Sequence, residues 1–341
     1  MFKNRYWLIL PLAVVLLAGC ASLTASSQAQ DAGRLVIYSG RSESLVAPII
    51  EQFSQASGIK VEVRYGNTAE LAATLLEEGK NSPADVFYAQ DPGGLGAIAN
   101  AGLLAVLPEE LLAKVESRFR SQEGWWVGIS GRARVVVYNT QRLKPEDLPE
   151  DLFGFTDPRW KGKIGWAPTN ASFQAMVTAM RKEWGEEKTK AWLDGIIANQ
   201  PVVFEGNTPI VAAVGSGEIE VGFVNHYYLY RFLKEQGEAF PARNHFINNG
   251  GPDSLVMVSG IGRLASGKNE ENALKFINFL LSPVAQQYFA GQTYEYPLVA
   301  GVQTMVDLPP LDNLNAANLT AEQLADLEGT LNLLRASGVL P

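Results

Sequence analysis

The sequence predicts an α/β protein of two lobes, each built on a mixed, mainly parallel sheet. The length of 341 residues suggests roughly two domains of ordinary size. A composition of 47% hydrophobic and 19% charged residues is typical of a globular chain. From residue 34 onward, short apolar runs alternate with amphipathic segments of helical period. This alternation is typical of parallel strands that are covered by helices on both faces.

The first part of the chain predicts three strands separated by two helices. Apolar runs at 35–40, 59–66 and 84–89 predict the strands, and the segments through Phe53 and up to Gly79 predict the helices. Parallel sheets bind ligands beyond the carboxyl ends of their strands. The residues that follow these runs are therefore candidates for binding: Ser39 to Ser42, Tyr65 to Asn67 and Tyr88 to Asp91. Asn67 is also a helix cap, because a glutamate stands three residues later at Glu70.

The second part predicts a similar series followed by a terminal helix. Thr208 and Pro209 predict a helix start with the cap followed by proline. We expect a terminal helix over 320–338 to dock on the second lobe. The strands are expected at 131–140, 164–168, 202–207, 219–225 and 255–264, and further helices at 170–184 and 271–281. We expect a first lobe of 34–132 plus about 258–307 and a second lobe of 133–257 plus about 308–341.

The N-terminus predicts export and lipid anchoring. Residues 1–19 combine a basic start with an apolar run from Trp7 to Leu17, which is too short to span a bilayer. The only cysteine, Cys20, ends a Leu-Ala-Gly-Cys segment that resembles the lipobox of bacterial lipoproteins. We therefore expect a signal peptide at 1–19, lipidation of Cys20, a flexible tether at 20–33 and an extracytoplasmic location, in the periplasm or at the cell surface. The alternative is that Cys20 is an ordinary small residue before a signal-peptidase site.

Composition excludes several classes of function. The net charge of −8 offers no basic footprint for nucleic acid. One cysteine and two histidines exclude a multi-Cys or multi-His zinc site, a disulfide framework and most histidine-based catalysis. Phosphate-loop, dinucleotide and nucleophile-elbow motifs are missing from the sequence. We therefore expect that the chain is not an enzyme. A hydrolase that uses His226 and a purely adhesive protein are the other interpretations.

Two adjacent tyrosines follow the strand expected at 219–225. Neighbouring strand residues point to opposite faces, so Tyr227 and Tyr228 can share a target only where the chain turns out of the strand. A phenol has a pKa near ~10, and two phenolates at neutral pH need a strong cation beside them. A hard trivalent ion such as ferric iron meets that need. The alternative is that these side chains pack under a loop as ordinary aromatics.

A second pattern predicts a site for an anion. The segment 169–172 follows a strand and opens a helix, where free backbone N–H groups attract negative charge. Arg41 and Arg132 lie near predicted strand ends and can form bidentate hydrogen bonds. Each feature also has a simpler explanation, as a helix cap or a solvated arginine.

In order and spacing, the chain resembles the periplasmic ferric-iron-binding proteins of ABC transporters, which are extracellular solute-binding proteins, here in lipoprotein form. The similarity covers nearly all of 35–302. It implies two lobes that close on a hinge, the type II periplasmic-binding-protein fold, in a monomer that works with a permease and an ATPase. It also implies Fe(III) as the ligand, with carbonate or a similar synergistic anion. The resemblance rests on VIYSG, TAELAATLLEEG, PADVFYAQ, SGRARVVVYNT, PRWKGKIGWAPTN, GEIEVGFVNHYYLY, SLVMVSG and YEYPLVAG.

The resemblance also implies roles for individual residues. Tyr227 and Tyr228 match the paired tyrosinate ligands, and Arg132 matches the arginine that binds the anion. The remaining matches are the anion loop, Thr169, Asn170, Ala171 and Ser172, and two asparagines of the same cleft, Asn207 and Asn225.

The first lobe departs from the pattern of the family. Arg41 stands where some members have histidine, and Gln90 stands where some have glutamate. The anion loop also lacks the third tyrosine that other members carry there. Either the first lobe supplies no strong metal ligand, or Tyr65 takes that position; Tyr65 also fits a packed aromatic at a strand end. A solute-binding protein for a phosphate ester, phosphonate, thiamine-like compound or polyamine is the alternative function.

Overall fold

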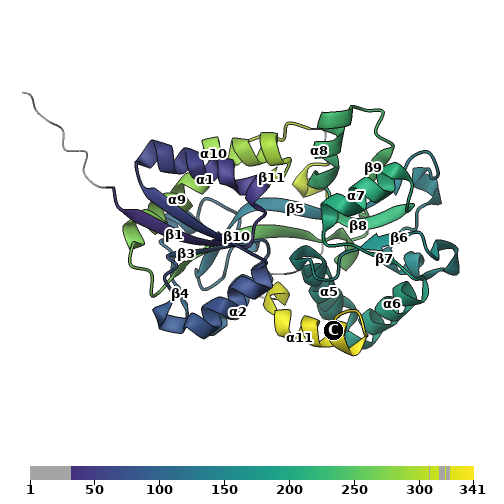
Figure 1. Cartoon of the computed structure of the whole chain (residues 1–341), viewed down its shortest axis with the longest axis horizontal. Coiled ribbons are helices and arrows are strands. Elements are labelled where there is room, and N and C mark those ends of the chain that lie inside the picture. The colour runs from purple at the N-terminus through teal and green to yellow at the C-terminus, as the bar shows by residue number, and fades with distance from the viewer. Residues whose placement is uncertain (1–31, 307, 315–318, 320–322) are drawn as a thin grey trace, which may run out of the picture. The chain divides into compact units, whose positions relative to one another are not determined.

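Two blocks of sheet, joined through one long strand, carry the fold of the computed structural model (Figure 1). The structure describes residues 32–306, 308–314, 319 and 323–341. The expected signal peptide, Cys20 and nearly all of the tether lie outside these residues. The strand order is β2-β1-β3-β10-β5-β8-β6-β7, with β4 and β11 beside the first block and β9 beside the second.

The first block combines three strands that pair in parallel with four that make antiparallel pairs. It contains β1 (Arg34–Ser39), β2 (Lys60–Tyr65), β3 (Val86–Ala89), β10 (Val256–Leu264), part of β5 (Trp126–Asn139), β4 (Leu104–Ala105) and β11 (Tyr296–Pro297). The second block contains the rest of β5 with β8 (Val221–Asn225), β6 (Ile164–Trp166), β7 (Val202–Val203) and β9 (Ala242–His245). Strands β1 to β3 and β6 to β8 pair in parallel, whereas β5 and β10 pair antiparallel with their neighbours. The prediction of a mixed α/β fold is confirmed.

Strand β5 changes partner halfway along its length. Residues up to Ala133 pair with β10, and residues from Arg134 pair with β8. Every residue of this strand is buried. The strand therefore runs through both blocks, and the residues at the change of partner lie between them.

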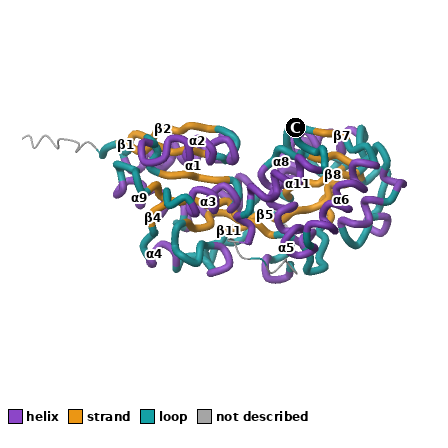
Figure 2. Tube along the Cα trace, turned by 90° about the horizontal axis from the view of Figure 1, so that it is seen from below, coloured by secondary structure: helices purple, strands orange, loops and turns teal. Residues whose placement is uncertain are grey.

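Helices lie on both sides of the strands (Figure 2). The helices are α1 (Glu43–Ser57), α2 (Thr68–Glu78), α3 (Pro92–Asn100), α4 (Glu109–Leu112), α5 (Ala171–Trp184), α6 (Glu186–Ala198), α7 (Asn207–Ser216), α8 (Tyr227–Gln236), α9 (Glu270–Leu280), α10 (Pro283–Tyr288) and α11 (Leu327–Ala336). Two hydrophobic cores result. One lies around Phe87 and Phe276 in the first block and extends into the second block as far as Ile210 and Val224, and the other lies in the second block around Trp192 and Phe223. None of the helices in the described ranges is long and apolar enough to cross a membrane.

Local signals place some helix ends correctly and others wrongly. Asn67 caps α2 as predicted, because its side chain accepts a hydrogen bond from the backbone of Ala69. The predicted cap at Thr208 is wrong, because α7 already begins at Asn207 after Gly206. The terminal helix α11 begins at Leu327, and the Asp326 side chain caps it; the predicted start at residue 320 lies outside the described residues.

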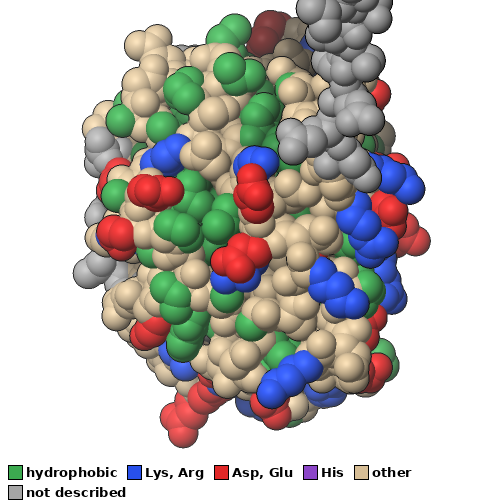
Figure 3. All heavy atoms as spheres, turned by 90° about the vertical axis from the view of Figure 1, so that its left-hand side faces the viewer, with side chains coloured by type: hydrophobic (Ala, Val, Ile, Leu, Met, Phe, Trp, Pro, Cys, Tyr) green, Lys and Arg blue, Asp and Glu red, His purple; other side chains and the backbone are tan. Residues whose placement is uncertain are grey.

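The surface of the first block mixes charges of both signs. Figure 3 shows acidic and basic side chains interspersed with hydrophobic ones on the face that it draws. Exposed pairs such as Lys60 with Glu62 and Lys275 with Glu271 belong to this block. Such exposed pairs contribute little to stability, so the fold rests on its buried cores.

Candidate functional site

The two tyrosines stand where the chain leaves strand β8. The strand ends at Asn225, and α8 begins at Tyr227. The rings of Tyr227 and Tyr228 stack with centroids 4.3 Å apart. Both side chains are buried, and the Tyr227 hydroxyl has no hydrogen-bond partner among the described residues. Burial, and then the neighbouring Tyr227, raise the pKa of Tyr228 well above its ordinary value. The chain thus turns out of the strand at the tyrosine pair, as it must if both phenols are to contact one ligand.

Two buried arginines lie on β5 beside the tyrosines. Arg132 and Arg134 are two residues apart, so their side chains lie on the same face of the strand. Within the part of the chain that the structure describes, none of the three guanidinium nitrogens of Arg132 has a hydrogen-bond partner. Arg134 Nη1 donates to Asn225 Oδ1 at 3.1 Å and more distantly to Asn207 Oδ1 at 3.4 Å. Burial, and then repulsion by Arg132, lower the pKa of Arg134 to about 9.

The buried carboxylate of Asp91 lies close enough to Arg132 for their charges to interact. Asp91 is buried, and its Oδ1 accepts from the backbone of Gly93 at the start of α3, at 3.1 Å. Its Oδ2 has no partner among the residues described. Burial raises the pKa of Asp91, and the positive charge of Arg132 opposes that rise. Buried cationic nitrogens without acceptors are costly, so this arrangement fits an anion as the missing partner.

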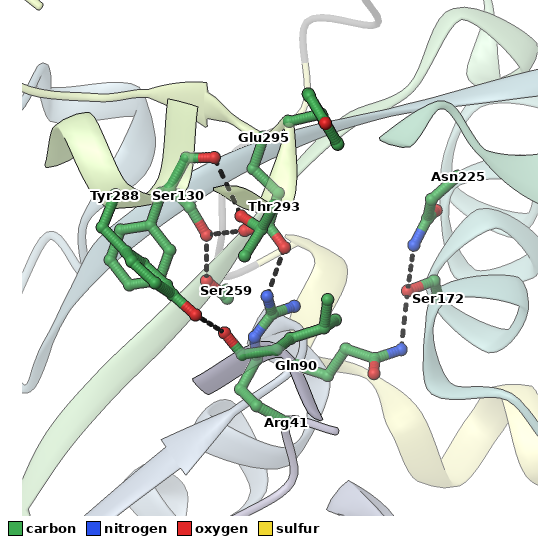
Figure 4. A network of polar contacts seen from close by, with 12 residues as sticks. Arg41, Gln90, Ser130, Ser172, Asn225, Ser259, Tyr288, Thr293 and Glu295 are labelled. Carbon is green, nitrogen blue, oxygen red and sulfur yellow. Dashed lines mark hydrogen bonds and ion pairs between the residues drawn. The ribbon is translucent and has the colours of Figure 1, made fainter. Parts of the chain in front are cut away.

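Ser172 joins residues that come from distant strands. Gln90 Nε2 and Asn225 Nδ2 each donate to Ser172 Oγ at 3.0 Å (Figure 4). The Asn170 side chain accepts from the Ser172 backbone at 3.0 Å and so starts α5 at this point. Asn207 Oδ1 accepts from the Asn225 backbone at 2.8 Å. Five of the predicted residues therefore lie in one hydrogen-bonded chain between the ends of β3 and β8.

Arg41 is buried beyond the end of β1 and forms an ion pair with Glu295 (Figure 4). Glu295 also accepts from Ser130 of β5, whose hydroxyl lies 2.7 Å from that of Ser259 on β10. Burial alone would lower the pKa of Arg41, but Glu295 raises it well above the ordinary value. Glu295 therefore balances the charge of Arg41 within the structure. Arg41 Nε and Nη1 nevertheless lack partners within the described ranges.

A cavity of about 280 Å³ opens between these elements. It is lined by residues of the first three strand ends and of the α5 start, among them Arg41, Tyr65, Gln90, Asn170 and Ala171. Burial, and then Glu43, raise the pKa of Tyr65 to about 12. Tyr65 therefore shares a cavity with Asn170 and Ala171 of the predicted anion loop.

Thr169 is exposed on the loop before α5. The next residues of the loop, Asn170, Ala171 and Ser172, lie closer to the site. The described residues contain no cluster of three or more His, Cys, Asp or Glu side chains suited to a metal ion. The oxygen atoms gathered here belong to phenols, amides and hydroxyls, and to the separate carboxylates of Asp91 and Glu295.

Two residues of the site were missed in the sequence. Arg134 had a readable signal, because it alternates with Arg132 along a strand and therefore shares its face. Glu295 had only a weak signal, a carboxylate between the aromatics Tyr294 and Tyr296. Its partner Arg41 lies 254 residues away in the chain.

Comparison with known proteins agrees with this geometry. The family model described as bacterial extracellular solute-binding protein matches residues 81–320. The Fe(3+)-binding periplasmic protein of Serratia marcescens is 34% identical over 330 residues, which are 96% of this chain and 97% of that protein.

Solved structures agree as well. Iron-bound HitA from Pseudomonas aeruginosa superposes with a TM-score of 0.86 at 36% identity, covering 89% of this chain and 99% of that one. The Trichodesmium protein IdiA (FutA), in complex with iron and citrate, gives a TM-score of 0.76 at 30% identity, covering 90% and 99%. The two-lobed fold of periplasmic binding proteins is thus confirmed, and the chain belongs to the bacterial extracellular solute-binding protein family, among relatives named for ferric iron.

Proposed function

We propose that this protein is the substrate-binding component of an iron(III) ABC transporter. It captures ferric iron with Tyr227 and Tyr228 together with a synergistic anion, and it delivers the iron to a permease driven by an ATPase. The observation that carries the proposal is a pair of adjacent buried phenols beside Arg132, a buried guanidinium without a hydrogen-bond partner among the described residues. The names of the relatives support the same ligand.

The binding chemistry follows from charge. The Tyr228 phenol is protonated in the metal-free protein at neutral pH, so iron must displace its proton on binding. Ferric iron favours the phenolate because hard cations prefer oxygen anions. Arg132 and Arg134 lie close enough to stabilise the phenolates and an anion such as carbonate. The amides of Asn207 and Asn225 hold Arg134 in place for this task.

The anion occupies the space between Arg132 and the start of α5. Asn170 and Ala171 line the cavity at the start of this helix, and the Asn170 side chain accepts from the backbone N–H of Ser172. We infer that the anion binds first and lowers the local positive charge, and that iron then enters on the tyrosine side. Tyr65 is the candidate ligand from the first lobe, because it lines the cavity that reaches Asn170.

Closure of the lobes then excludes water. We place the lobes at 34–132 plus about 258–307 and at 133–257 plus about 308–341, because β5 changes partner between Ala133 and Arg134. The bond from Gln90 to Ser172 spans that division. The terminal helix α11 lies mainly on α5, and the turn before it also lies against α3. Hinge closure of this kind is common in binding proteins.

The proposed location is outside the cytoplasm, in the periplasm or at the cell surface. Lipid on Cys20 anchors the monomeric protein near its permease, and binding itself involves no nucleic acid and no chemical conversion. In cell fractionation, the wild-type protein should follow the membranes, whereas a Cys20→Ala variant should be found in the soluble extracytoplasmic fraction. A wild-type protein found only in the soluble fraction would argue against the anchor.

The iron proposal is tested by adding ferric nitrilotriacetate and bicarbonate to the metal-free protein. We expect a visible phenolate-to-iron charge-transfer band and a higher melting temperature. Tyr227→Phe combined with Tyr228→Phe should abolish the band, and Tyr230→Phe, on the same helix, should retain it. A colourless wild-type protein with an unchanged melting temperature refutes the proposal. A small organic compound in the native mass spectrum would instead favour an anionic or organic solute.

A further inference from the structure

His226 connects strand β8 to helix α8, directly before the tyrosine pair. Its side chain is completely buried. We propose that His226 is a positioning residue that holds Tyr227 and Tyr228 at a set distance from Arg132 and from the Arg41–Glu295 ion pair. This inference rests on the proposed function and adds to it the residue that assembles the site.

One side of His226 is bound to the arginine strand. Its backbone N–H donates to the Ala133 carbonyl oxygen at 3.0 Å. Its Nδ1 accepts from the Ala133 backbone N–H at 3.2 Å. Ala133 lies between Arg132 and Arg134 on β5. The double attachment therefore fixes the start of α8 against the residue that separates the two buried guanidinium groups.

The other side of His226 is bound to the segment that carries Glu295. Because Nδ1 accepts a hydrogen bond, the ring proton lies on Nε2, which donates to the Tyr294 carbonyl oxygen at 2.8 Å. Tyr294 has a φ of 59°, in the left-handed region, and follows the π-helical turn Phe289–Thr293. A left-handed backbone is unfavourable in a residue other than glycine, so it persists only where surrounding contacts hold it.

The remaining contacts of His226 leave it little freedom. Its carbonyl oxygen accepts from Asn244 Nδ2 at 2.7 Å, so all four of its polar groups are used. The imidazole meets the Tyr227 ring edge-on with centroids 5.7 Å apart and packs on Tyr296 at 5.0 Å. A shift of the imidazole would therefore move the first phenol ring relative to both charged groups.

Only a planar ring with an acceptor on one side and a donor on the other makes both links at once. Phenylalanine keeps the ring shape of His226 and loses both side-chain hydrogen bonds. Asparagine keeps an acceptor near the Nδ1 position, and glutamine reaches the Nε2 position. The three substitutions therefore separate packing from the link to Ala133 and from the link to Tyr294.

The test loads wild type, His226→Phe, His226→Asn and His226→Gln with ferric nitrilotriacetate and bicarbonate. We measure the wavelength of the phenolate-to-iron band, the rate of iron release to a chelator and the melting temperature of the metal-free protein. In His226→Phe the band should shift and iron release should become about tenfold faster or more, as expected when support of a metal ligand is lost. His226→Asn and His226→Gln should each recover part of both effects. His245→Phe, on β9, is the matched control and should leave the band and the rate unchanged.

The outcomes separate this inference from the proposed function. A wild-type protein without any band overturns both. A wild-type band that stays at the same wavelength and release rate in His226→Phe overturns only the positioning role, even where the melting temperature falls. If His226→Phe does not fold, His226→Asn and His226→Gln decide: a band and rate equal to wild type in both also overturn the inference.

Discussion

The hydrogen bond from Gln90 to Ser172 gives a direct test of lobe closure. Gln90 follows β3 in the first lobe, and Ser172 begins α5 in the second, with 3.0 Å between Nε2 and Oγ. The substitution Gln90→Met removes this bond and keeps an unbranched side chain of similar size. Once the lobes separate, water replaces Ser172 as the partner of the amide. The substitution should therefore weaken the closed form and leave the open form nearly unchanged.

The size of the effect follows from the value of one neutral hydrogen bond. Such a bond contributes about 0.5–1.5 kcal/mol net to stability. At 1.4 kcal/mol for each factor of ten, the loss corresponds to roughly a 2- to 12-fold change in the closing equilibrium. Because iron leaves from the open form, its release rate should rise by about the same factor.

Stopped-flow release of iron to a chelator measures this rate. The matched control is Thr178→Val, which removes the 2.7 Å hydroxyl bond between Thr178 of α5 and Thr330 of α11. That change should lower the melting temperature of the metal-free protein and leave the release rate as it was. If Gln90→Met instead lowers the melting temperature and leaves release unchanged, the bond belongs to the metal-free fold and the closure reasoning is refuted.

Three further predictions concern charge. Burial and Tyr227 raise the pKa of Tyr228, so iron binding must displace its proton. The affinity for iron should therefore fall about tenfold per pH unit for each displaced proton as the pH drops from 8 to 5. An affinity that does not change with pH, after correction for the chelator, contradicts this. Arg132→Gln removes a buried cation that has no partner among the described residues. In parallel titrations, iron binding to this variant should no longer depend on bicarbonate, and its melting temperature should not fall. If iron binding still depends on bicarbonate, the anion binds elsewhere. Glu295→Gln leaves the buried Arg41 without its carboxylate partner. The loss should cost about 3–5 kcal/mol of stability and lower the melting temperature by roughly 6–20 °C, and adding Arg41→Met should restore part of it. A drop of under about 2 °C in calorimetry would contradict this prediction.

Short-range patterns of the sequence predict much of the fold. The apolar runs predicted β1, β2, β3 and β8 close to their observed bounds, because strand burial depends on neighbouring residues. The side chain of Asn67 caps α2 for an equally local reason. The position of the tyrosine pair just beyond a strand was readable too, since a turn there lets adjacent side chains face one target. The cap of α11 at Asp326 was not predicted, although aspartate is a common helix cap.

The pairing of charges was decided by the tertiary structure. Arg41 and Glu295 are 254 residues apart, and Gln90 and Ser172 are 82 apart, so no local period relates them. The first pair forms because β1 and β5 belong to one block of sheet, with β3 and β10 between them, and Glu295 enters at the ends of these strands. The same arrangement buries Arg132 without an acceptor among the described residues. Sequence alone determined which side chains have suitable chemistry; the packing of distant segments decided which charges are balanced and which still need a ligand.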